Sequence, residues 1–427
     1  MVGDSETGQG GLAGTGRIER VEMMRWRWWG IFAVLILIAG CSRHALRSAG
    51  DPLSLPYKRT AVLGEGKEWR PHPLLVDLNN DRHLDIVATH RNPLEENSLH
   101  IWMGDGKGNF SEINQTWRSP AYSALASGDI NLDGYQDLVV VSHNARIYTL
   151  MGDGEGGFTE KVLGTEDGYV AVKLADLNRD GLLDAVLMGY KKAGIEIYHG
   201  DSKGNWSLQR RLSAGQVGRD LAVGDINNDG HLDIAAVQNG PGVLVYVSDG
   251  QGGWTGGPTG FYSATRDFKS IALSDVNQDG NLDVVLNGGF ISLKEPNGPD
   301  VYLGDGKGGW RPSSQGLKTL KSATYGIALG DMDKDGRLDL VCGGNVTGEI
   351  GWEDYGLFLF RGDGKGGWTL SKNSGLPARG LMEPYGMVLG DVNEDGDLDI
   401  VAMNSDTSEE GYSGYISIWM RQGASSE

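Results

Sequence analysis

The chain of 427 residues has a formal net charge of −19, with 57 acidic residues against 38 basic ones. This balance excludes proteins that bind nucleic acid or anionic membranes through a basic surface, so no nucleic-acid partner is expected. Glycine supplies 68 residues, about twice its usual share, and the two cysteines, Cys41 and Cys342, are too few for a disulfide framework.

Residues 1–40 are predicted to be a start region and a signal peptide. The first 22 residues are polar, glycine-rich and without periodicity, whereas two arginines then precede the apolar stretch Trp28–Ala39 and the sequence Ile38-Ala39-Gly40-Cys41. A transmembrane helix is the alternative, but it needs about 20 apolar residues. The pattern resembles the lipobox of bacterial lipoproteins. This resemblance implies acylation of Cys41, a lipidated tether over 41–56, a membrane anchor through that lipid, and a place in the bacterial cell envelope, at the outer membrane.

One nine-residue pattern recurs seven times at intervals of about 50 residues, which indicates a repeat architecture. In the copy Asp225–Asp233, oxygen-bearing side chains stand at positions 1, 3, 5 and 9, and glycine stands at position 6. Side-chain oxygens at alternate positions of a tight loop suit a hard cation. An EF-hand would also need Glu at position 12, where this copy has Ala236. Seven divalent cations would neutralise most of the net charge.

Each repeat predicts four strands, with the acidic loop between the first two and a Gly-Asp-Gly turn between the last two. The last repeat lacks its turn and fourth strand, while an additional strand, Tyr57–Leu63, precedes the first acidic loop. We therefore expect an all-β protein: a seven-bladed β-propeller over 57–427, closed by the N-terminal strand pairing with the last blade. We also expect the aromatic residue after each turn to pack between blades. These residues are Phe110, Phe158, Trp206, Trp254, Trp310 and Trp368.

The acidic loops and glycine-rich turns together resemble FG-GAP/VCBS repeats, which form the propeller of integrin α-subunits, several secreted lectins and many bacterial surface proteins. The resemblance covers Tyr57 to Met420 and implies up to seven structural calcium ions. Positions 1, 3, 5 and 9 would bind calcium through side chains, and position 7 through its carbonyl. The implied ligands are Asp77, Asn79, Asp81, His83, Asp85, Asp129, Asn131, Asp133, Tyr135, Asp137, Asp176, Asn178, Asp180, Leu182, Asp184, Asp225, Asn227, Asp229, His231, Asp233, Asp275, Asn277, Asp279, Asn281, Asp283, Asp331, Asp333, Asp335, Arg337, Asp339, Asp391, Asn393, Asp395, Asp397 and Asp399.

Two loops depart from the pattern. Arg82 replaces the glycine at position 6 of the first loop, which predicts about 1 kcal/mol of backbone strain and the weakest site. Asp333 replaces asparagine in the sixth loop, and the additional carboxylate is expected to tighten binding.

A partner surface is predicted on the face away from the acidic loops. The connections there are longer in blades 5, 6, 7 and 1, which are neighbours in a closed ring, and long loops on a rigid scaffold often carry function. Loops that only cover the propeller mouth are the alternative. Trp69, Tyr325 and Tyr385 begin inner strands near the same face and are expected in the core. The candidate ligand-binding residues of this arc are His90, Arg91, Phe290, Lys294, Trp352, Asp354, Tyr355 and Tyr412.

These features favour a calcium-stabilised, lipid-anchored protein that faces the cell surface or periplasm and binds a glycan or an envelope or extracellular protein. Two alternatives stay open. One is a carbohydrate-active enzyme similar to a polysaccharide lyase, in which Arg91 or Lys294 supplies the basic group; the other is a structural subunit of an envelope complex. The sequence contains no nucleophile elbow, zinc motif or phosphate-binding loop, and we name no catalytic residue.

Overall fold

The computed structural model describes a set of segments between residues 56 and 422. It divides the chain into two units, Met1–Ala49 and Gly50–Glu427, and every described residue belongs to the second. The predicted signal peptide, Cys41 and the tether therefore lie outside the described residues. The described segments are 56–70, 72–90, 97–113, 123–191, 194–212, 218–238, 242–258, 266–290, 298–346, 354–406 and 413–422.

In these segments no helix has the length and hydropathy that a membrane span requires.

The described chain forms seven antiparallel sheets of four strands each, as the repeats predict. Blade 7 is β26–β28 together with β1. From inner to outer strand, the blades are β2 (Leu74–Val76), β3 (Asp85–Thr89), β4 (Leu99–Gly104), β5 (Phe110–Glu112); β6 (Ser123–Gly128), β7 (Asp137–Ser142), β8 (Arg146–Gly152), β9 (Phe158–Gly164); β10 (Tyr169–Ala175), β11 (Asp184–Gly189), β12 (Ile195–Gly200), β13 (Trp206–Leu212); β14 (Gly218–Gly224), β15 (Asp233–Gln238), β16 (Val243–Ser248), β17 (Trp254–Pro258); β18 (Arg266–Ser274), β19 (Asp283–Phe290), β20 (Asp300–Gly304), β21 (Trp310–Pro312); β22 (Ser322–Gly330), β23 (Asp339–Asn345), β24 (Tyr355–Gly362), β25 (Trp368–Leu370); and β26 (Glu383–Gly390), β27 (Asp399–Asp406), β28 (Ser413–Arg421), β1 (Tyr57–Leu63).

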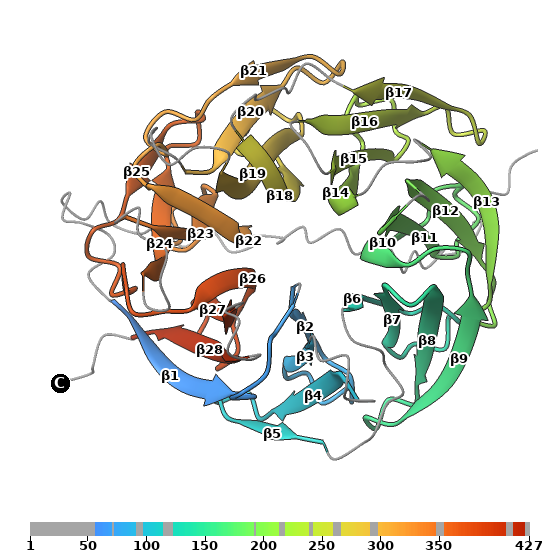
Figure 1. Ribbon diagram of the computed structural model, residues 1–427, viewed down its shortest axis with the longest axis horizontal. Coiled ribbons are helices and arrows are strands. Elements are labelled where there is room, and N and C mark those ends of the chain that lie inside the picture. Colours follow the sequence, from blue (N-terminus) through green and yellow to red (C-terminus); the bar gives the residue numbers. More distant parts are fainter. Residues whose placement is uncertain are drawn as a thin grey trace, which may run out of the picture. The chain divides into compact units, whose positions relative to one another are not determined.

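The blades follow one another around a ring whose centre is lined by the innermost strands (Figure 1). Each innermost strand contacts those of the adjacent blades, and the contact between β2 and β26 completes the circle. β1 pairs antiparallel with β28, from Tyr57 opposite Arg421 to Leu63 opposite Ile416. The predicted closure by the N-terminal strand is thus confirmed. It covers the edge of β28, which would otherwise expose unpaired backbone groups.

The hydrophobic core lies between successive blades. The second strand of a blade is buried on both faces, as in β7, where all six residues are buried, whereas the outermost strand β13 is buried only at its two ends. All six aromatic residues after the turns pack against core clusters formed by two adjacent blades. Their predicted role in blade packing is confirmed. Cys342 is a buried free thiol in one of these clusters, and burial raises its pKa.

The acidic loops all join the first strand of a blade to the second, and therefore lie on one face of the ring. The turn between the third and fourth strands comes to the same face. A glycine commonly ends the third strand, because a Cβ at Gly104, for example, would overlap the carbonyl oxygen of Leu84 in the acidic loop. The opposite face carries the beginnings of the innermost strands.

Candidate metal centres

The seven acidic loops share one hydrogen-bond pattern. In the fourth loop, Oδ1 and Oδ2 of Asp225 accept from the backbone N–H groups of Asp229 (3.1 Å) and Gly230 (2.8 Å). Oδ1 of Asn227 also accepts from the Asp229 N–H (3.1 Å). Corresponding bonds occur in the other six loops. The side chains at positions 1, 3 and 5 thereby converge inside a tight turn.

Two positions of every loop have a left-handed backbone. Position 6 is glycine in six loops, with φ between 83° and 90°, and it is Arg82 in the first, with φ of 74°. The left-handed conformation predicted for Arg82 is confirmed. Position 4 is also left-handed, although it is never glycine, and this was not foreseen. Its seven residues are Asn80, Leu132, Arg179, Asn228, Gln278, Lys334 and Glu394.

Four of the seven side chains at position 4 connect consecutive loops, which gives these four residues a reason to be larger than glycine. The Asn228 amide donates to Oδ1 of Asn281 in the fifth loop (2.7 Å), and Gln278 donates to the carbonyl oxygen of Gly336 in the sixth (2.5 Å). Around the ring, Lys334 of the sixth loop pairs with Asp397 of the seventh (2.8 Å). Glu394 of the seventh loop then contacts His83 Nδ1 of the first (2.5 Å).

The carboxylate at position 9 is fully buried in all seven loops and bonds to the blade itself. Oδ2 of Asp233 accepts from the N–H of Ile226 (2.9 Å), and its Oδ1 accepts from the N–H of Ser248 at the end of the third strand (2.8 Å). The same two bonds recur in the other six blades. Position 9 therefore ties the loop to the third strand, a role that we did not predict. The glycine that recurs at the end of the third strand was the available signal.

Burial raises the pKa of these carboxyl groups, although the backbone donors oppose the shift. The pKa of Asp85, Asp184 and Asp283 rises to about 6, and that of Asp339 and Asp399 to about 7. Neighbouring carboxylates at positions 1, 3 or 5 raise it further in all five of these loops. A cation in the loop would favour the ionised form of all of them.

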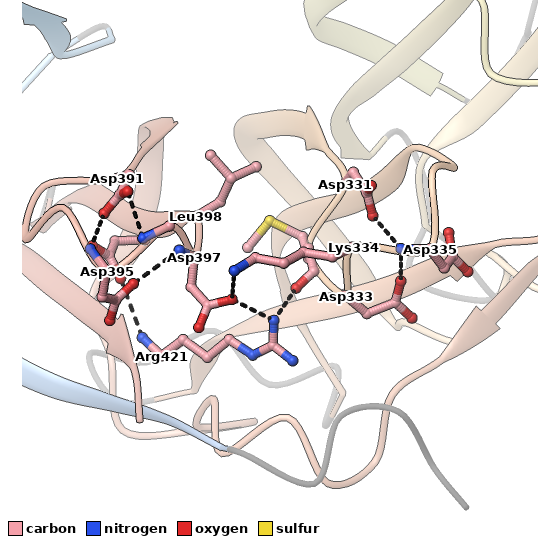
Figure 2. A network of polar contacts seen from close by, with 12 residues as sticks. Asp331, Asp333, Lys334, Asp335, Asp391, Asp395, Asp397, Leu398 and Arg421 are labelled. Carbon is pink, nitrogen blue, oxygen red and sulfur yellow. Dashed lines mark hydrogen bonds and ion pairs between the residues drawn. The ribbon is translucent and has the colours of Figure 1, made fainter. Parts of the chain in front are cut away.

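The sixth loop has the donor set that best fits a cation. Carboxylate oxygens of Asp331, Asp333 and Asp335 lie within 4.8 Å of one another (Figure 2). In the other loops an asparagine at position 3 donates its amide to the position-5 carboxylate, as Asn227 does to Asp229 (2.8 Å). Asp333 has no such proton to donate. Its Oδ2 is buried without a hydrogen-bond partner, and burial and the charge of Asp335 raise its pKa. Because carboxylate oxygens are hard ligands, this donor set fits calcium.

A second polar network ties the seventh loop to the sixth (Figure 2). The Asp397 carboxylate accepts from Lys334 Nζ (2.8 Å) and from Arg421 Nη1 (2.9 Å). The same guanidinium nitrogen donates to the carbonyl oxygen of Met332 in the sixth loop (3.0 Å). Arg421 is 7% exposed, so its contacts with Asp397 of blade 7 and Met332 of blade 6 join the two blades in a partly desolvated place.

The structure describes only some of the residues predicted on the arc of long loops. His90 is fully buried, near Trp69 and His100, because it pairs with Trp69 at the inner end of blade 1; it is therefore not an exposed ligand contact. Asp354 forms an ion pair with Arg379 (2.9 Å), and Tyr355 begins β24. Phe290 is the last residue of β19, and its side chain is not described. Arg91, Lys294, Trp352 and Tyr412 lie outside the described residues.

Aromatic and charged side chains gather where the innermost strands begin, on this same face. The rings of Tyr325 and Tyr385 stack with their centroids 4.5 Å apart. The Arg70 guanidinium lies 3.8 Å from the centroid of the Tyr385 ring, and Lys269 Nζ lies 5.7 Å from that of Tyr325. Trp69 and Tyr385 are buried, as expected of core residues, whereas Tyr325 is only half-buried. The charged partners of this cluster, which come from blades 1 and 5, were not predicted.

Comparison with known proteins identifies the repeats and the fold. The family model for FG-GAP-like repeats matches residues 77–140, 129–187, 225–286 and 290–342. A T-cell immunomodulatory protein homolog of Plasmodium yoelii yoelii is 34% identical over 84 residues, which span 19% of this chain and 10% of that relative.

Among solved structures, BBS1N in complex with ARL6DN, soaked with mercury, has a TM-score of 0.53 at 11% identity, covering 86% of this chain and 97% of that one. The same complex soaked with lead gives a TM-score of 0.52. These likenesses show the fold alone.

Proposed function

We propose that this chain, which belongs to the FG-GAP-like repeat family, is a calcium-stabilised binding protein of the bacterial cell envelope. FG-GAP propellers are scaffolds for surface or binding proteins in general. The proposal adds calcium at the acidic loops, a lipid anchor on Cys41, and a glycan or protein partner at the opposite face.

The sixth loop carries the calcium part of the proposal. A buried carboxylate oxygen without a partner, beside two further carboxylates, is costly unless a cation is bound there. Side chains of all seven loops converge in the same way. The six loops with asparagine at position 3, including the first loop with Arg82 at position 6, would therefore bind calcium through the same positions. Because the ion binds only the folded loops, it would stabilise the propeller.

The cluster of Arg70, Lys269, Tyr325 and Tyr385 supports a partner at the face opposite the loops. Stacked tyrosines beside cations offer a large contact area at low entropic cost and donors for hydroxyl, carbonyl or carboxylate groups. Residues from four blades meet there, so the cluster exists only when the ring is closed. The arc of long loops predicted from the sequence for this face would enlarge the contact.

Calcium is tested by the ion content and melting temperature of the full chain. We expect up to seven bound calcium ions per chain and a melting temperature that falls on chelation. If the protein contained no calcium after purification in its presence, and melted identically with chelator, the calcium part of the proposal would be refuted.

Partner binding is tested with a glycan array and affinity capture from envelope extracts. We expect a selective partner that is lost with Tyr325→Ala and kept with Lys58→Ala, an exposed change on β1. A correctly folded chain that binds nothing in either assay, or that binds equally well after Tyr325→Ala, would contradict the proposal that a partner binds at this face.

The anchor is tested separately by mass spectrometry of the protein from a bacterial host. A lipid on Cys41 that disappears with Cys41→Ser is the expected result, and an unmodified cysteine would contradict it.

A further inference from the structure

A pocket of 320 Å³ lies between blades 3 and 4, at the face that carries the acidic loops. Blade 3 contributes residues from its acidic loop and from β12 and β13, and blade 4 contributes its last turn and Trp254. This volume is at the lower end of the range for small-molecule sites, roughly 300–1,000 Å³. It lies on the opposite side of the ring from the proposed partner face. Its lining includes Asn178, Ile197, His199, Gln209, Arg210 and Trp254.

The pocket lies at a gap between blades that a methionine side chain fills at three other interfaces. Blade 3 has His199 in place of that methionine. The glycine two residues before the aromatic residue of the turn faces Met420 in blade 7, Met103 in blade 1 and Met151 in blade 2, because a Cβ on Gly108, Gly156 or Gly204 would meet those side chains. In blade 3 the equivalent residue is His199, and a Cβ on Gly252 would meet nothing within 4 Å. A Cβ on Gly308, the equivalent glycine of blade 5, also meets no atom within 4 Å, so it is the 320 Å³ pocket itself that shows the open space between blades 3 and 4.

A β-bulge alters the same wall. β12 and β13 pair Ile197 with Arg210 and Tyr198 with Leu208, so that Gln209 is an additional residue in the outer strand. The outer strand of blade 7, β1, has a comparable shift between Arg59 and Ala61, whereas the described outer-strand pairings of blades 1, 2, 4, 5 and 6 have none. A bulge re-aims the side chains around it. Gln209 and Arg210 both line the pocket as a result.

Trp254 also lacks a partner that its counterpart has. Trp206, one blade earlier, donates its indole N–H to Oγ1 of Thr149 (2.7 Å) and is 8% exposed. Ile197 stands at the position of Thr149 and has no acceptor, and Trp254 is half-buried at the pocket wall. Its indole therefore offers both a ring face and a donor to a ligand.

The lining is rich in donors and has no carboxylate, although the protein has a net charge of −19. Arg210 is exposed, and among the described residues no carboxylate pairs with it, whereas the adjacent Arg211 is paired with Glu196 and Glu166. Arginine, histidine, amide and indole donors around an aromatic face suit an acceptor-rich ligand with one apolar side.

We propose that this pocket binds a uronic acid residue. The apolar face of the pyranose would stack on Trp254, and its carboxylate would be held by Arg210, with Gln209 and His199 donating to hydroxyl groups. The site is separate from the proposed partner face and does not depend on it.

Titration of the calcium-loaded full chain with methyl β-D-glucuronide and methyl β-D-glucoside, followed by saturation-transfer NMR, tests this site. We expect the glucuronide to bind at least about tenfold more tightly, as a charge-assisted hydrogen bond implies. His199→Met should close the pocket with the side chain used at three other interfaces, and Arg210→Gln should remove the preference for the acid. Met103→Leu is the matched control between blades 1 and 2 and should leave binding unchanged.

Absence of binding by either glycoside to the wild-type protein would overturn the proposal, as would equal binding by wild type, His199→Met and Arg210→Gln. If His199→Met does not fold, Trp254→Phe replaces it, because Phe110 and Phe158 hold that position in blades 1 and 2. Loss of stacking area should then weaken glucuronide binding, and unchanged binding would overturn the proposal. Tyr325→Ala should leave this titration unchanged, so failure here and failure of the proposed partner face are distinguishable.

Discussion

Single residues set the quality of each acidic loop, and Arg82 is the one that departs most from its backbone requirement. A side chain at φ of 74° costs about 1 kcal/mol relative to glycine. We expect Arg82→Gly to raise the free energy of unfolding by roughly that amount, less the entropy that glycine adds to the unfolded chain. Urea denaturation measures this change.

Gly134→Ala is the matched control, since position 6 of the second loop has φ of 90° and a Cβ there meets no atom within 4 Å. Gly134→Ala should lower the free energy of unfolding through backbone strain alone, which is the opposite of the change expected for Arg82→Gly. Destabilisation by Arg82→Gly would show that the arginine makes a compensating contact.

Asp333 affects the stability of the sixth loop differently with and without calcium. Asp333→Asn should raise the melting temperature in chelator, because the new amide can donate to Asp335 as Asn227 donates to Asp229. The same change should reduce the increase in melting temperature that calcium causes, because one carboxylate ligand is lost. Asn227→Asp should do the reverse. Calorimetry with and without calcium measures both changes, and a loss of stability in chelator with Asp333→Asn would contradict the cost inferred for the Asp333 oxygen that lacks a partner.

Within each blade, the carboxylate at position 9 makes stability depend on pH. An aspartate with a pKa of 3.8 in the unfolded chain has a pKa of about 7 at Asp339 and Asp399 in the fold. The folded state therefore holds more protons between these values, and stability present below the unfolded pKa is lost as pH rises through the folded one. We expect the metal-free protein to lose unfolding free energy from about pH 4 to about pH 7. Urea denaturation at a series of pH values measures it.

Calcium should oppose this dependence, because the ion favours the ionised carboxylates. Asp339→Asn is the control in metal-free protein, since it removes one of the two most shifted groups and should flatten the pH profile. A metal-free protein whose stability rises steadily from pH 4 to 7 would contradict the raised pKa values.

For the whole molecule, ring closure is the feature that a single strand controls. Tyr57 is 2% exposed, donates its hydroxyl to the carbonyl oxygen of Leu398 (2.9 Å) and begins β1. Tyr57→Ala should cost roughly 3–5 kcal/mol, as large aromatic truncations do. Hydrogen exchange should then accelerate first in β28, whose edge β1 covers, and later in β7. Lys58→Ala, an exposed change on the same strand, is the control, and uniform acceleration across all blades would contradict closure by β1.

Much of the fold could be predicted because short residue spacings within each repeat indicate its strands, loop and turn. The Asp and Gly spacing of each loop fixed the number of blades, and the missing strand in the last repeat matched the additional strand Tyr57–Leu63. Position 9 was assigned to calcium, and its bonds to the blade were missed, because a buried anchor and a metal ligand can both be aspartate. His90 follows a strand in the sequence, as an exposed residue would, yet pairing with Trp69 buries it.

The sequence by itself therefore determined what depends on short spacings: seven blades, seven acidic loops, the turns and the closing strand. Only the tertiary structure decided what depends on atoms of different repeats meeting. It showed four position-4 side chains connecting one loop to the next, the Asp333 oxygen that lacks a hydrogen-bond partner, and the pocket beside His199, whose counterpart is methionine at three other interfaces. Local backbone preferences depend on the residue type at each position. Packing between blades depends instead on side chains that lie some 50 residues apart in the chain.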